Sequence, residues 1–196
     1  MKELKNKTTF NEATDGYTPV VPGTYPAHVK EMEVREFGDS GRKLFKLTFV
    51  VADDVKNITV NKMERKVNGN GLTPVLDSDG KNVEVSANYL AGKTFFSKGI
   101  WLTPNPEKGQ GWRNRNYKEF FESLGIEWAV TKEGDAILGE VEEDDVIGVP
   151  CLVKVVEEKY EKDGEQKTAL KVGRAMVWNE GSKLSREEIQ ADDIPF

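Results

Sequence analysis

The sequence predicts a mainly β fold, a five-stranded Greek-key barrel with one helix between its third and fourth strands. The prediction rests on periodicity: three runs of alternating apolar and polar residues precede a helical stripe of aromatic residues, and two more runs follow it. Gly and Pro turn signals separate these segments. They are therefore expected to follow one another as three strands, a helix and two strands.

The first two strands are expected to form an antiparallel hairpin. Residues 24–37 alternate until a phase shift near Lys30, which indicates a bulge or bend at that point. A Gly-containing turn leads to residues 42–52, the most regular strand of the chain, with Phe45 and Phe49 on the same face. We expect this face to lie in the core.

The third strand is expected at residues 93–103, after an insertion at about 57–91 that contains two strong turn signals. Pro104 follows the strand and ends it. Strict alternation divides the strand into two faces. The outward face is expected to carry Lys93, Phe95 and Trp101, and the core face is expected to carry Phe96, Ile100 and Leu102.

The helix is predicted at residues 112–124, followed by Gly125 as a C-terminal cap. The acidic run 127–145 is expected to be a loop, and residues 151–156 and 166–178 form the last two strands. The helix prediction rests on apolar residues spaced i, i+3, i+4 and i+7, namely Tyr117, Phe120, Phe121 and Leu124.

This order of elements is that of the OB-fold, a partly open five-stranded barrel whose second and third strands, with adjoining loops, bind oligonucleotides. We expect one such domain at residues 1–178. A disordered acidic tail is expected at 179–196, with a short helix near 185–190.

Composition argues against several other classes. No apolar run approaches the ~18 residues of a membrane-spanning helix, and the polar N-terminus predicts no signal peptide. With one cysteine, Cys151, and one histidine, His28, the chain has no intrachain disulfide and too few ligands for a Cys/His zinc site. No catalytic motif is found, so neither an enzyme nor a cofactor is expected.

The negative charge is unevenly distributed. The net charge of the chain is −6, yet residues 132–145 carry seven acids against one base and residues 179–196 carry five acids against two bases. The remaining body therefore has a net charge of +3. A modestly basic body beside an acidic tail is compatible with a phosphate-binding surface.

The C-terminal sequence is the most specific motif. It joins two carboxylates, a small apolar pair and an aromatic ring, in the order Asp192, Asp193, Ile194, Pro195 and Phe196. This tip resembles the acidic tip of bacterial and phage single-stranded DNA-binding proteins. The resemblance implies that the tip docks replication and recombination proteins.

Four internal patches resemble a family of phage-encoded OB-fold proteins that bind single strands. They are residues 22–27, 46–49, 120–125 and 146–155. The resemblance implies sequence-independent binding of single-stranded DNA during phage replication, recombination or repair, in the cytoplasm of a bacterial host. It leaves open a homo-oligomer, a strand-annealing factor, and an OB-like protein-interaction module that binds no nucleic acid.

Single strands are held by a positive groove that follows the backbone and by aromatic faces on which bases stack. Basic and aromatic residues alternate near the second and third strands and before the helix. The candidate DNA-binding residues are Arg42, Lys43, Lys46, Lys93, Phe95, Lys98, Trp101, Trp112, Arg113 and Arg115.

Overall fold

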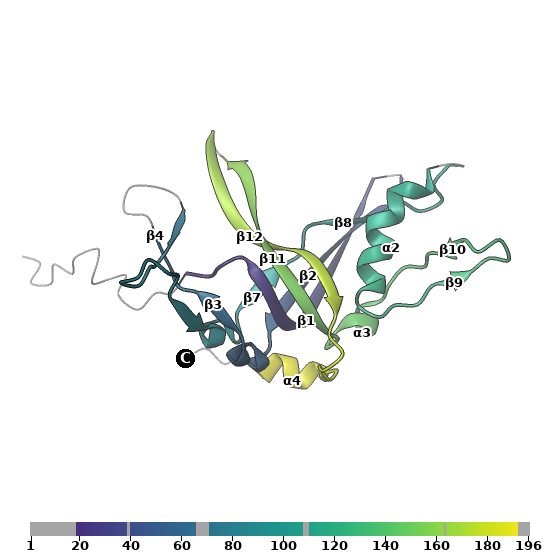
Figure 1. Cartoon of the computed structure of the whole chain (residues 1–196). Helices are drawn as coiled ribbons and strands as arrows, with labels where there is room; N and C mark the ends of the chain where they lie inside the picture. Colours follow the sequence, from purple (N-terminus) through teal and green to yellow (C-terminus); the bar gives the residue numbers. More distant parts are fainter. Residues whose placement is uncertain (1–18, 39, 66–70, 108–109, 163, 192–196) are drawn as a thin grey trace, which may run out of the picture.

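The computed structural model describes residues 19–38, 40–65, 71–107, 110–162 and 164–191. The protein is mainly β, and every strand ladder in the described part of the chain is antiparallel (Figure 1). The main sheet has the order β12–β11–β1–β2–β7, and β8 also pairs with β2. Residues 1–18 and the C-terminal tip, residues 192–196, lie outside the described residues.

The first hairpin forms as predicted. Strands β1 (Gly23–Phe37) and β2 (Arg42–Val51) pair along most of their length, and their register shifts between Val29 and Glu31. The shift confirms the bulge predicted near Lys30, where one strand accommodates an extra residue.

The third strand is divided into β7 (Thr94–Phe96) and β8 (Ile100–Leu102). Leu47 is hydrogen-bonded to Ser97, and Phe45 pairs with Ile100. Residues 98 and 99 of the third strand therefore lie opposite the single β2 residue Lys46. This bulge at residues 98–99 reverses the inward and outward alternation along the strand.

The reversal makes the predicted outward face wrong for β7. Phe95 lies opposite Phe49 and is buried, with 5% of its surface exposed, and its ring stacks on that of Tyr25 at 6.4 Å. Phe96, which was expected in the core, is 58% exposed. The prediction holds for β8, where Trp101 lies on the outer face and its neighbours are buried.

The last two strands form a long hairpin. Strands β11 (Pro150–Lys162) and β12 (Glu165–Val177) pair throughout, and β11 also pairs with β1. Ser97, between β7 and β8, forms one isolated parallel bridge with Val172 of β12. The two edges of the main sheet, β12 and the end of β7, therefore meet at one bridge and do not form a continuous ladder.

The insertion between β2 and β7 consists of short elements on the side of the body away from α2 (Figure 1). Val55, Ala87 and Leu90 are buried and attach it to the core. Its elements are η1 (Asp53–Asn57), β3 (Thr59–Asn61), β4 (Met63–Arg65), β5 (Leu72–Pro74), β6 (Glu84–Ser86) and η2 (Ala87–Leu90).

Helix α2 (Arg115–Glu122), which continues from the 3₁₀ helix η3 (Gly111–Asn114), covers one end of the core. Tyr117 and Phe121 are fully buried, and their ring centroids lie 5.1 Å and 5.6 Å from that of Phe45. The aromatic stripe predicted from the sequence therefore forms the contact between the helix and the sheet.

The acidic run 127–145 is not a plain loop, contrary to prediction. It contains a short hairpin, β9 (Ala129–Val130) with β10 (Ala136–Ile137), and the helix α3 (Glu143–Val146). Acidic residues are favourable in the first turn of a helix, and a capping box between Glu142 and Asp145 satisfies backbone donors there.

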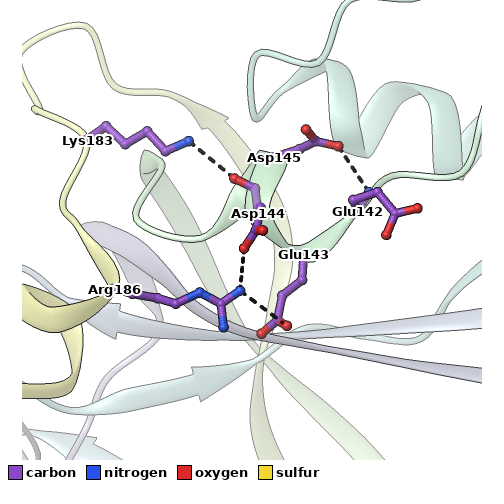
Figure 2. Close-up of polar contacts among 6 residues, drawn as sticks. All are labelled: Glu142, Glu143, Asp144, Asp145, Lys183 and Arg186. Atoms are coloured by element: carbon purple, nitrogen blue, oxygen red, sulfur yellow. Dashed lines mark hydrogen bonds and ion pairs between the residues drawn. The ribbon is translucent and has the colours of Figure 1, made fainter.

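The expected disordered tail is wrong for residues 179–191, which pack on the body. Arg186, at the start of α4 (Arg186–Ala191), donates a 2.6 Å hydrogen bond to Asp144 and forms an ion pair with Glu143 (Figure 2). Ile189 is buried, and the Leu184 amide donates to the Gly148 carbonyl.

Gly148 permits this approach. Its φ of +77° lies in the left-handed region, and a Cβ built there would lie 1.8 Å from the Leu184 carbonyl oxygen. The acidic run and the C-terminal segment, which the sequence presents as two separate negative regions, are thus in contact through Arg186.

Replacing each of the adjacent residues Phe95 and Phe96 by Ala tests the strand reversal. Phe95→Ala leaves a cavity beside Tyr25 and is expected to lower the free energy of unfolding by about 3–5 kcal/mol. Phe96→Ala removes the same atoms from a mainly exposed site, so we expect a change within about 0.5 kcal/mol. Urea unfolding measures both, and equal losses would contradict the assigned faces.

Candidate nucleic-acid interface

The largest concentration of predicted binding residues lies in a hollow of about 1030 Å³ between β8, α2, η3 and β12. We call this hollow the basic–aromatic groove. It brings together five of the ten predicted residues, which are Arg42, Lys98, Trp101, Trp112 and Arg113.

Trp101 forms the first aromatic wall of the basic–aromatic groove. It lies opposite Leu44 on the outer face of β8. The Arg42 guanidinium lies 4.7 Å from the centroid of its ring, a cation–π distance, and the Phe37 ring lies 5.2 Å away. These contacts hold an indole beside a positive charge, an arrangement suited to a stacked base next to a phosphate.

Trp112 forms the second aromatic wall and is 69% exposed. Its position in η3 is fixed by its neighbour Asn114. The Asn114 side chain accepts a 2.7 Å hydrogen bond from the Thr103 amide and donates a 2.9 Å bond to the Thr103 carbonyl. Arg113 lies 5.9 Å from the Trp112 ring. A firm loop thus presents one indole and one guanidinium to solvent.

Strand β12 supplies Arg174, which sequence reasoning missed. Arg174 is exposed and lines the basic–aromatic groove beside Gly173, where a Cβ would approach Val156 to 2.9 Å. The one available signal was Gly173 itself, because a glycine within a strand marks a bulge or a close approach. The structure shows a register shift between β11 and β12 at this level.

The basic–aromatic groove is positive, but it contains two acids. Its lining carries four cations, those of Arg42, Lys98, Arg113 and Arg174, against the carboxylates of Glu119 and Glu122. The hydrogen bond from Arg115 holds the pKa of Glu119 below its usual range, so Glu119 is charged at neutral pH. Lys98 forms an ion pair of 3.4 Å with Glu158.

The structure places the other five predicted residues elsewhere. Lys43 pairs with Glu140, and that hydrogen bond raises the pKa of Lys43. Lys46 is exposed on β2 opposite Glu33, and Arg115 lies on the far side of Trp112. The residues outside the basic–aromatic groove are therefore Lys43, Lys46, Lys93, Phe95 and Arg115.

The two residues best suited to chemistry have structural environments. Cys151 is buried in the core, and burial raises the pKa of its thiol to about 12, which keeps it protonated and unreactive. His28 donates through Nε2 to the Ser182 carbonyl at 3.1 Å and packs against Trp178. Within the described residues, no group of three or more acids, histidines or cysteines could hold a metal.

The predicted docking tip, residues 192–196, lies outside the described residues. None of the helices in the described part of the chain is long and apolar enough to cross a membrane. Comparison of the chain with protein-family models and with curated proteins found no match.

Proposed function

We propose that this protein binds single-stranded DNA without sequence preference, using the basic–aromatic groove. The observation that carries the proposal is the interleaving of two indoles, the half-buried Trp101 and the exposed Trp112, with arginine side chains at cation–π distance. Stacking of a base on an aromatic side chain contributes roughly 1–3 kcal/mol and tolerates any base. Guanidinium groups beside the stacked bases neutralise phosphates, which gives the salt dependence typical of such binders.

The body is proposed to be an OB-fold. Its strand order is that of the fold if β7 and β8 together count as the third strand, with β11 and β12 as the fourth and fifth. Helix α2 falls between the third and fourth of these strands, and the bridge from Ser97 to Val172 joins the third to the fifth. This fold binds oligonucleotides on the face of its second and third strands and on adjoining loops. The basic–aromatic groove adjoins that face through β8.

The C-terminal tip is proposed to recruit replication and recombination proteins. The proposal rests on its sequence, in which two carboxylates precede an apolar pair and a phenyl ring. A basic-rimmed pocket with an apolar slot on a partner can capture such a segment. The preceding helix α4 is anchored on the body through Ile189 and Arg186, so deletion of residues 192–196 tests the tip without disturbing the fold.

A protein-interaction module is the second candidate, because Glu119 and Glu122 beside the cations give the groove a mixed charge that suits a peptide carrying charges of both signs. The two candidates differ in ligand and in salt response. Poly-dT binding that weakens steeply with salt supports the first. If poly-dT does not bind at low salt, single-strand binding is excluded and the protein-interaction module becomes the favoured function.

Trp112→Ala is expected to weaken binding of a dT oligonucleotide by about 5- to 150-fold, which corresponds to the loss of one stacked base. Fluorescence anisotropy at fixed salt measures the affinity. Phe96→Ala is the matched control, since Phe96 is a similarly exposed aromatic residue that does not line the basic–aromatic groove. A loss at Phe96 with none at Trp112 would place the bases on the outer face of β2 and β7 instead.

Replacing Arg42, Arg113 and Arg174 by Gln is expected to reduce the salt dependence of binding. Each lost phosphate contact lowers the slope of log affinity against log salt by about 0.7, so the triple variant should lose about 2. Titrations at several salt concentrations give the slope. Lys132→Gln, an exposed cation in the β9–β10 turn, should leave it unchanged. An unaltered slope in the triple variant would rule out these three contacts.

A further inference from the structure

A second hollow, of about 1060 Å³, lies on the other side of Trp112. It is bounded by the segment that follows β8, by the first turn of α2 and by the β9–β10 hairpin. We call it the second hollow. Three of the predicted DNA-binding residues, Lys43, Trp112 and Arg115, line it.

Trp112 and Thr103 line both hollows. Trp112 is therefore a ridge between them, with its indole mostly exposed. A strand that stacks an internal base on this ridge leaves it on both sides. If one side is the basic–aromatic groove, the other side is the second hollow.

The second hollow offers cations along its α2 side. Arg115 and Lys118 come from the first turn of the helix. A third cation, Lys43 at the start of β2, is paired with Glu140 instead of lying on the α2 side. Arg115 and Lys118 form 2.6 Å ion pairs with Glu119 and Glu122, one turn further along the same helix. Exposed pairs of this kind contribute little to stability, so a phosphate can replace the carboxylate at low cost.

The opposite side of the second hollow is acidic. Asp135 lies on the β9–β10 hairpin, and Glu140 lies just beyond it and holds Lys43. A negatively charged backbone is repelled from this side and attracted to the side of Arg115 and Lys118. The charge distribution therefore defines a path along the edge of α2.

We propose that the single strand bound in the basic–aromatic groove continues over Trp112 into the second hollow, where Arg115 and Lys118 contact its phosphates. The binding site is then longer than the groove alone, and Trp112 stands within it rather than at its end. This inference rests on the proposed single-strand binding. It gives Arg115, a predicted DNA-binding residue that lies outside the basic–aromatic groove, a place on the same path and adds Lys118.

The test compares two oligonucleotide lengths on the full chain. A dT oligomer of about 5 nucleotides fills one hollow, and one of about 15 nucleotides spans both, within the range of site sizes for OB-folds. The variant is Arg115→Gln with Lys118→Gln. The matched control is Lys56→Gln with Lys81→Gln, two exposed cations that line neither hollow. Urea midpoints check that both doubles remain folded.

We expect the Arg115→Gln/Lys118→Gln variant to bind the short oligomer like the wild type, because that oligomer keeps the contacts of the basic–aromatic groove. Its affinity for the long oligomer should fall about tenfold at 0.1 M salt, with a salt slope smaller by about 1.4. The control should match the wild type at both lengths.

Equal losses at both lengths would overturn the inference, since the two cations would then act on the basic–aromatic groove, either directly or through their partners Glu119 and Glu122. No loss at either length would also overturn it, because the strand would not reach the second hollow. Failure of the proposed function has a different result, in which the wild type binds neither oligomer.

Discussion

The structure depends on the burial of Phe45 between the main sheet and α2. Its ring contacts Tyr117 and Phe121, and all three side chains are withdrawn from water. A helix of eight residues is too short to be stable by itself, so α2 needs this contact to form. Because η3 leads directly into α2, the same contact determines where Trp112 and Arg113 stand. The proposed interface is therefore positioned by the core.

The parts of the fold that the sequence predicts well are those whose periodicity continues over many residues. Strands β1 and β2, including the bulge at Lys30, and the aromatic stripe of α2 belong to this class. The failure at β7 has a local cause. The local signal of the extra residue at 98–99 is Gly99, but in a strand this short it does not show on which face each later residue lies. The reason for this glycine, a close approach to Leu44, exists only in three dimensions.

Half of the predicted site could be recognised, because Lys98, Trp101, Trp112 and Arg113 lie within one segment of the chain. The fifth residue, Arg42, comes from the start of β2 and reaches Trp101 through the pairing of β2 with β8. Arg174 could not be recognised from the sequence. It lies on β12, which is at the other edge of the main sheet from β7 and β8 and approaches them only because the sheet curls. Lys43 was misplaced because its partner Glu140 lies 97 residues away. In the same way, the docking of 179–191 depends on Asp144 and Gly148, which no local pattern associates with Arg186.

The bulge between β7 and β8 also has an evolutionary consequence. Phe95 and Trp101 are six residues apart and would share a face in a regular strand, yet one is core and the other is surface. Straightening the strand at its present length would force an exchange, burying the indole or exposing the phenyl ring. Deleting one residue at 98–99 would instead leave an odd spacing of five, and a regular strand would then keep each ring on its present face. Related chains with an even spacing between these aromatic positions should therefore keep the bulge, and those with an odd spacing should lack it.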